Sequence, residues 1–132
     1  MAISALARKL LVKPGQRMVL LNAPAGYAEA LAPLPEGVAV STAPAADADF
    51  VQVFVKDSAE LHSLGPQAIG SARPDGLLWI CYPKKSSKVA TDLTRDVLWD
   101  LVKQYGVVGV TLVSIDDTWS AMRFRPADQV GR

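Results

Sequence analysis

Three short runs of the sequence carry apolar side chains on both alternating faces, and they limit the possible folds more than any other feature. They span residues 18–21, 50–55 and 77–83, and Gln52 is the one polar interruption. A strand that is apolar on both faces is buried on both sides, which is typical of a parallel sheet covered by helices. We therefore expect these three runs to be central strands of an α/β sheet.

Helical segments alternate with the strands. Ser4 is expected to cap a first short helix, and an Asp57 cap is expected to open a helix with a bend or restart at Gly65-Pro66. The other predicted helices span residues 27–34 and 91–105, and the other predicted strands span 37–41, 107–115 and 119–124. Residues 73–76 are predicted to form a turn, and residues 126–132 a loose tail.

The last two predicted strands are separated by too few residues for a helical crossover, so they must run antiparallel. Strands that alternate with helices and end in a hairpin indicate an α/β fold with three layers. We expect residues 1–132 to form a single Rossmann-like domain, with a mostly parallel six-stranded sheet and an antiparallel C-terminal hairpin.

Composition excludes several classes of function. The 132 residues are half hydrophobic and fit one domain, and a net charge of +1 argues against nucleic-acid binding. No apolar run approaches the roughly 20 residues needed to cross a bilayer, so we expect no membrane association. The single cysteine, Cys81, cannot form an internal disulfide, and the first residues do not resemble a secretory signal. These features predict a cytoplasmic protein.

A candidate ligand site follows the central run 77–83. Ligands of open parallel sheets bind outside the carboxyl ends of the strands, and a helix N-terminus favours anions. Thr91 or Asp92 is the expected helix cap, and a phosphate, nucleotide or carboxylate would suit the site. The predicted ligand-binding residues are Asn22, Lys84, Lys85, Ser86, Ser87, Lys88, Thr91, Thr94, Arg95, Asp116 and Asp117.

Two other interpretations remain open for the same residues. Lysines beside serines are often a solvated connector, and Arg95 could pair with nearby carboxylates to tie the loop to the final hairpin. Alternatively, the chain is an enzyme in which Lys84, Lys88 or Arg95 stabilises negative charge and Asp116 or Asp117 moves a proton. No metal is expected, because His62 is the only histidine and lacks a ligand pattern.

Residues 13–21 resemble the opening strand of class I S-adenosylmethionine-dependent methyltransferases, and residues 73–80 resemble a later strand of that family. The resemblance implies the strand order 2-1-3-4-6-5, with one helix and one strand missing between Ser41 and Phe50. Where that family has a glycine-rich loop, this chain has residues 22–27 with Pro24. Ser41 and Thr42 stand where an acidic residue would hold the cofactor, so we expect no cofactor.

The chain also resembles a small bacterial family of domains of unknown function. The similar segments are residues 21–24, 82–88, 91–96 and 116–121. This resemblance implies the fold and no activity. Together these observations predict a non-enzymatic domain that binds an anionic small molecule or a protein partner. Trp99 and the sixth-strand region suggest a homodimer surface.

Overall fold

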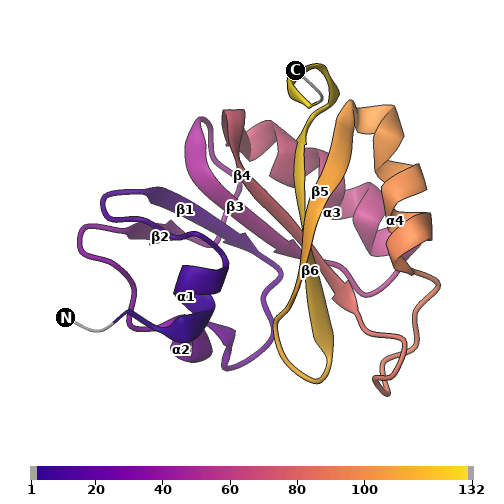
Figure 1. Cartoon of the computed structure of the whole chain (residues 1–132), viewed down its shortest axis with the longest axis horizontal. Helices are drawn as coiled ribbons and strands as arrows, with labels where there is room; N and C mark the ends of the chain where they lie inside the picture. The colour runs from indigo at the N-terminus through magenta and orange to yellow at the C-terminus, as the bar shows by residue number, and fades with distance from the viewer. Residues whose placement is uncertain (1–2, 131–132) are drawn as a thin grey trace.

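The computed structural model describes residues 3–130, which contain one sheet with the strand order β2-β1-β3-β4-β6-β5 (Figure 1). Strands β1 to β4 are parallel, and β6 runs antiparallel to both of its neighbours, β4 and β5. The predicted fold class and strand order are confirmed. The strands are β1 (Arg17–Leu21), β2 (Ala39–Ser41), β3 (Ala48–Phe54), β4 (Ala72–Pro83), β5 (Val107–Ser114) and β6 (Trp119–Pro126).

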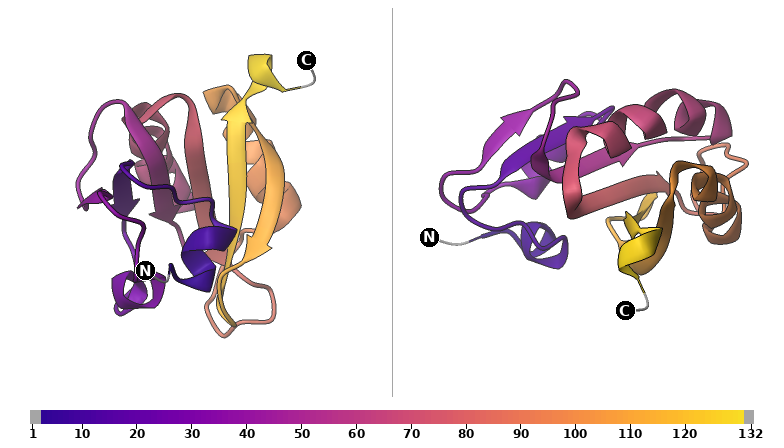
Figure 2. Two further views of the ribbon diagram at one scale, coloured as in Figure 1. Left: turned by 60° about the vertical axis from the view of Figure 1, so that its left-hand side comes forward. Right: turned by 90° about the horizontal axis from the view of Figure 1, so that it is seen from above.

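Helices cover both faces of the sheet. Seen from above, the sheet lies between two helix layers (Figure 2). One layer contains α1 (Ala5–Lys9) and α2 (Tyr27–Leu31), and the other contains α3 (Ser58–Ser71) and α4 (Arg95–Val102). Short 3-10 turns follow α4 at Lys103–Tyr105 and β6 at Ala127–Gln129.

The central strands supply side chains to both layers, as their two-faced apolar pattern predicts. In β3, Val51 and Val53 pack on the α3 side, whereas Phe50 and Phe54 pack on the α1 side. All four side chains are fully buried. Gln52 lies among them and donates to Cys81 Sγ, so its polar group is satisfied inside the core.

A short connector replaces the strand and helix that the methyltransferase pattern has after β2. Residues 42–47 lead from the edge strand β2 to β3, which pairs directly with β1. The Ala45 amide donates to Ser71 Oγ at 3.1 Å, which ties the connector to the end of α3. The expected gap between Ser41 and Phe50 is therefore present.

Two predicted helix features need correction. Of the bend or restart expected at Gly65-Pro66, the restart is wrong, because α3 continues through Pro66. Proline removes the hydrogen bond to the carbonyl four residues earlier, and that residue, His62, is exposed, so water can satisfy the carbonyl. The expected cap at Thr91 or Asp92 is also wrong, since α4 begins one turn later with Thr94 as its cap.

Residues 73–76 belong to β4, although they were predicted to form a turn. Ala72 pairs with Ala48, and the register then shifts before Leu77 pairs with Phe50. Asp75 takes a left-handed conformation with φ +53° at this irregularity. The turn-forming residues therefore make a bulge inside a long strand. The predicted tail contains the turn Ala127–Gln129, and residues 131–132 lie outside the described part of the chain.

Candidate functional site

A hollow of about 400 Å³ opens where β4 ends, beside the start of α4 and the start of β6. It lies at the carboxyl end of a central parallel strand, where ligands of open α/β sheets bind. Its lining residues are Tyr82, Pro83, Lys84, Lys85, Ser86, Leu93, Thr94, Arg95 and Ser120.

The loop after β4 is held in a tight turn that shapes one wall of the hollow. The Ser87 amide and hydroxyl both donate to the Lys84 carbonyl, at 3.0 and 2.7 Å. The Lys84 amide donates to the Thr118 carbonyl at 2.7 Å, so the loop is joined to the β5–β6 hairpin. This part of the alternative interpretation, a polar connection between the loop and the hairpin, is present in the structure.

The start of α4 forms the opposite wall. Thr94 Oγ1 accepts a hydrogen bond from the Val97 amide at 3.2 Å, which fixes the first turn of the helix. Leu93, just before the cap, is buried in the core and holds this segment against the sheet. The wall is thus positioned by a cap on one side and by apolar burial on the other.

Three cations line the hollow, and none of its lining residues is acidic. Lys84 Nζ donates to Ser114 Oγ at 2.5 Å, and Arg95 Nε lies 3.4 Å from Asp96 Oδ1. The Arg95–Asp96 pair is largely exposed, and such pairs contribute little in water. Lys85 is exposed and forms no hydrogen bond to a described residue. The hollow is therefore an electropositive site.

Tyr82 contributes a hydroxyl that the sequence reasoning did not include. Its residue is only 5% exposed, but its hydroxyl, which forms no hydrogen bond with residues 3–130, is not a buried atom and contacts solvent. Burial raises the pKa of the Tyr82 hydroxyl, and the Arg95 charge opposes this effect. The side chain is thus a neutral donor at neutral pH, without a partner in the protein.

The structure brings together five of the predicted site residues in the lining of the hollow: Lys84, Lys85, Ser86, Thr94 and Arg95. Ser87 and Lys88 lie in the same loop but outside the lining. Thr91 Oγ1 accepts from the Leu93 amide at 3.0 Å and shapes the backbone before α4.

The remaining predicted residues lie elsewhere. Asp116 Oδ1 accepts from the amides of Thr118 and Trp119, both at 2.8 Å, and so shapes the hairpin turn. Asp117 is exposed beside it. Asn22, at the end of β1, donates to the Phe54 carbonyl at 2.8 Å and does not line the hollow.

Sequence reasoning missed Tyr82, Pro83, Leu93 and Ser120 as lining residues. Ser120 pairs with Tyr82 across the antiparallel β4–β6 ladder. Tyr82 and Pro83 stand at the end of the central apolar run, directly before the basic loop. The available signal was the strand end itself, because the last side chains of a strand border any site at its carboxyl end.

The strand order and the antiparallel β6 define a methyltransferase-like Rossmann domain, and comparisons with solved structures agree. A methyltransferase from Aquifex aeolicus, described as S-adenosylmethionine-dependent, has a TM-score of 0.65 at 13% identity, over 90% of this chain and 86% of that one. A chain of a fibrillarin/Nop5p complex has a TM-score of 0.54 at 12% identity, over 93% and 81%. A ribosomal protein L11 methylase from Lactobacillus delbrueckii subsp. bulgaricus has a TM-score of 0.52 at 11% identity, over 92% and 74%.

No protein-family model matches the sequence, and no curated protein matches it significantly. The likeness to solved structures therefore defines the fold. Among the described helices, none is long and apolar enough to cross a membrane. Residues 3–130 also contain no group of three or more His, Cys, Asp or Glu side chains arranged to hold a metal ion.

The residues at the end of β1 do not fit the cofactor that this fold implies, S-adenosylmethionine. Asn22 Nδ2 and the Lys56 amide both donate to Glu60 Oε1, at 3.4 and 2.8 Å, so the protein's own side chains bridge the rim between β1 and β3. Ser41, at the end of β2, hydrogen-bonds with Ala43 and offers no carboxylate for a ribose. The elements that would hold the cofactor are therefore replaced by internal contacts.

Proposed function

We propose that this methyltransferase-like domain binds an anionic small molecule in the hollow at the end of β4, without S-adenosylmethionine. The observation that carries the proposal is a hollow lined by three cations, no acidic residue and the side chain of Tyr82. A bound anion can accept hydrogen bonds from the cations and from the Tyr82 hydroxyl, which is not a buried unsatisfied atom and contacts solvent in the free protein.

Charge and size both support this ligand class. Lys84, Lys85 and Arg95 approach the hollow from two different segments, so their side chains can contact one anion from two sides. Charge-assisted hydrogen bonds of this kind are about twice as strong as neutral ones. The volume, about 400 Å³, lies within the range of small-molecule sites, roughly 300 to 1,000 Å³.

The walls favour a ligand with an apolar part as well as an anionic group. Tyr82, Pro83 and Leu93 supply aromatic and aliphatic surface, whereas the cations and the hydroxyls of Ser86 and Ser120 supply polar contacts. A bare inorganic ion would leave the apolar walls unused. We expect phosphate monoesters or carboxylates with an apolar or aromatic body to bind more tightly than phosphate itself.

Binding without catalysis is favoured because neither proposed proton-transfer residue, Asp116 or Asp117, lines the hollow. The Asp116 carboxylate already accepts two backbone amides of the hairpin turn. No described residue that lines the hollow carries a carboxylate or an imidazole, the usual groups that exchange protons near neutral pH.

A thermal-shift screen tests the proposal. The panel contains inorganic phosphate, adenosine monophosphate, phenyl phosphate, benzoate and S-adenosylmethionine. A ligand at 100 times its dissociation constant stabilises a protein by about 2.7 kcal/mol, or roughly 8 °C for a domain of this size. We expect stabilisation by at least one of the anionic organic ligands and none by S-adenosylmethionine.

Three variants locate the binding. Lys85→Ala and Arg95→Ala should each weaken binding about tenfold or more, since a hydrogen bond to a charged group contributes about 1.5 to 3 kcal/mol. Lys88→Ala is the matched control, because Lys88 is an exposed lysine of the same loop that does not line the hollow. An equal loss in Lys88→Ala would indicate non-specific charge attraction and contradict the site.

Tyr82→Phe tests the contribution of the Tyr82 hydroxyl. The variant keeps the ring and removes a hydroxyl that contacts solvent, so the free protein should be about as stable as wild type. Ligand affinity should fall severalfold, measured by isothermal titration calorimetry. Unchanged affinity in Tyr82→Phe, or stabilisation of the wild type by S-adenosylmethionine alone, would overturn the proposal.

A further inference from the structure

Strand β5 is an edge strand whose own residues carry no charge. It is the outermost strand of the sheet, contains eight residues and pairs only with β6. Residues 107–115 include no charged side chain and no proline. Monomeric proteins usually protect edges with charges, prolines, bulges or short strands, as at the opposite edge, where β2 has only three residues. In β5 the register shifts between Gly109 and Thr111, and Lys9 Nζ donates to the Ser114 carbonyl at 2.7 Å. The stretch 111–113 between these two features is therefore open to pairing.

The location of the homodimer surface expected from the sequence needs one correction. The expected surface included the sixth strand, but β6 lies inside the sheet between β4 and β5. Trp99 is exposed, at 41% of its surface, and lies beside β5. The exposed edge strand next to Trp99 is thus β5.

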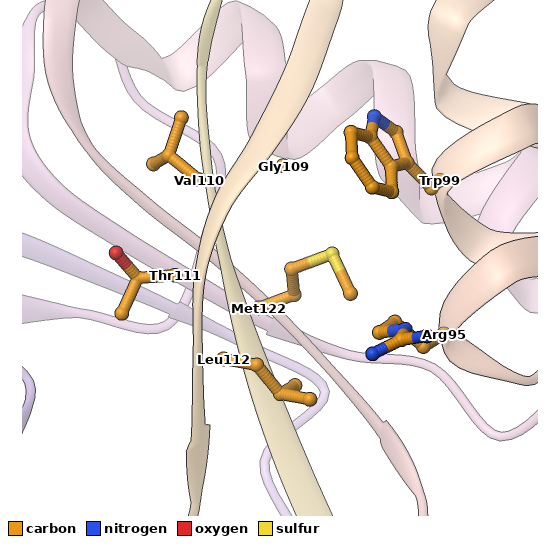
Figure 3. A pocket seen from close by; sticks show the side chains of 7 residues that line it. All are labelled: Arg95, Trp99, Gly109, Val110, Thr111, Leu112 and Met122. Atoms are coloured by element: carbon orange, nitrogen blue, oxygen red, sulfur yellow. The ribbon is translucent and has the colours of Figure 1, made fainter.

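A groove of about 200 Å³ runs along this edge between α4 and β5. Figure 3 shows Trp99 and Arg95 on α4 facing Leu112 and Met122 across the groove, whereas Val110 and Thr111 point to the other side of β5. The absence of a side chain at Gly109 leaves room for Met122, because a Cβ there would lie 2.7 Å from Met122 Sδ. The groove is mainly apolar.

We propose that β5 pairs with β5 of a second copy of the chain, antiparallel about a two-fold axis perpendicular to the sheet. An added strand must place uncharged, apolar side chains toward the groove, and β5 itself does so with Leu112, which is 46% exposed. The pairing is self-complementary, because an uncharged strand never sets like charges opposite each other. Both α4 helices would then lie on one face of a continuous twelve-stranded sheet.

The two grooves close on each other in this arrangement. Residues that face each other in an antiparallel pair lie on the same side of the sheet. Leu112 of each copy therefore lies between the two α4 helices, where both Trp99 side chains are. Main-chain hydrogen bonds provide affinity and the filled grooves provide specificity, as in other strand-addition complexes.

The size of the surface predicts a reversible dimer. Eight residues extend over about 27 Å, and a sheet edge with one helix layer is roughly 20 Å deep, so the face projects on the order of 500 Å². The accessible surface area of this uneven face is larger than its projected area. We therefore expect each partner to bury about 600 Å², the low end for specific interfaces. We expect a dissociation constant in the micromolar range.

Sedimentation velocity over about 1 to 500 µM tests the proposal. The wild type should shift from monomer to dimer, and Leu112→Lys should raise the dissociation constant tenfold or more. Val40→Lys is the matched control, because Val40 is 47% exposed on the opposite edge strand, close to the 46% of Leu112. Circular dichroism spectra and melting curves establish that each variant is folded.

Cross-linking then tests the strand pairing itself. Cysteine is introduced singly at positions 111, 112 and 113, and Val40→Cys is the control. Cys81 does not interfere, because it is fully buried and burial raises the pKa of its thiol to about 12. We expect a disulfide-linked dimer from at least one position in β5 and none from Val40→Cys.

Three results would contradict the proposed dimer in different ways. If the wild type stays monomeric at all concentrations, β5 does not pair with a second copy, and the proposal is overturned. A dimer that resists Leu112→Lys but is lost in Val40→Lys would place the interface at β2. Loss of the dimer in Leu112→Lys without a cross-link at any of the three positions would exclude β5 pairing. None of these measurements depends on anion binding, so the two proposals fail separately.

Discussion

Gln52 is a polar residue at the centre of an apolar core, and both ends of its side-chain amide are hydrogen-bonded. Tyr27 Oη donates to Gln52 Oε1 at 2.9 Å, and Gln52 Nε2 donates to Cys81 Sγ at 3.2 Å. The chain of contacts joins α2, β3 and β4. Burial raises the pKa of both Tyr27 and Cys81, so both remain protonated at neutral pH and can keep these roles. Cys81 is thus a structural thiol, as its place in the central strand predicts.

Replacing Gln52 with leucine should destabilise the protein by about 1 to 3 kcal/mol, because the buried Tyr27 hydroxyl would lose its acceptor. Adding Tyr27→Phe to the same protein should recover most of the loss, since both polar partners are then gone. Urea unfolding of the two single variants and the double variant measures the coupling. Additive losses would show that the hydroxyl and the amide do not depend on each other.

Asp92 holds the start of a helix to which it does not belong. Its carboxylate accepts hydrogen bonds from the amide and the hydroxyl of Ser58, the first residue of α3. These hydrogen bonds lower the pKa of Asp92 below its ordinary value of 3.8. A charged carboxylate at the N-terminus of α3 is also favoured by the helix dipole.

The lowered pKa of Asp92 predicts a loss of stability in acid. The unfolded chain binds the proton more tightly, so the contribution of Asp92 is complete above pH 3.8 and disappears as the pH falls through the lower folded value. In Asp92→Asn, urea midpoints should decline less steeply between pH 5 and pH 2. Asp117→Asn removes an exposed carboxylate without a hydrogen bond to a described residue. Its urea midpoint should decline with falling pH as the wild-type midpoint does. Equal slopes in Asp92→Asn and wild type would contradict this role.

The start of α4 shows where local sequence signals stop being sufficient. Thr91, Asp92 and Thr94 are all good capping residues, so the sequence allows more than one start. Asp92 instead contacts Ser58, which is 34 positions earlier, and Thr94 becomes the cap. A contact between distant segments decides among equivalent local choices. Such a contact is not visible in residue spacing.

The central strands and the final hairpin, in contrast, follow from local patterns, whereas the full strand order was implied only by the resemblance to the methyltransferase family. Runs that are apolar on both faces at 18–21, 50–55 and 77–83 must be central, and the short connection between β5 and β6 requires an antiparallel hairpin. The loop and helix start that line the hollow follow from the same order. The orientation of Tyr82 and the engagement of Asp116 depend on packing in three dimensions, so the sequence alone did not reveal them.

The bulge in β4 depends on Gly76 for steric reasons. A Cβ at this position would lie 3.1 Å from the Arg73 carbonyl oxygen and 3.2 Å from the Ala48 carbonyl oxygen. Both are backbone atoms of paired strands and cannot move away easily. Gly76→Ala should therefore destabilise the protein by about 1 to 3 kcal/mol in urea unfolding.

Gly70→Ala is the matched control for the bulge. Gly70 lies in α3, where a Cβ would meet nothing within 4 Å. Alanine favours a helix over glycine by about 0.5 to 1 kcal/mol, so this variant should be more stable than wild type. Destabilisation of both variants to the same extent would show that the loss in Gly76→Ala has no connection with the bulge.

The whole molecule has two core layers that share one set of strands. Alternate residues of β1 enter opposite layers, Val19 and Leu21 on the α3 side and Met18 and Leu20 on the α1 side. The indole of Trp79 also donates to the Leu10 carbonyl at 3.1 Å, which joins the end of α1 to the central strand β4. Neither layer can lose its packing without exposing strands that the other layer needs.

This shared construction predicts a single cooperative unfolding transition, which a variant in each layer can test. Leu10 and Leu98 are both fully buried, one in each layer, so Leu10→Ala and Leu98→Ala should each cost about 2 to 5 kcal/mol. Far-ultraviolet circular dichroism follows the helices, of which α3 and α4 are the longest described. The change in tryptophan emission follows the α1 side, because Trp79 is buried there, Trp119 packs against the same cluster and Trp99 is already exposed. Because the strands are common to both layers, the two signals should change at the same denaturant concentration in each variant. Separate midpoints in Leu10→Ala, with Trp79 exposed before the helices are lost, would show that the α1 layer unfolds independently and that the sheet does not couple the two cores.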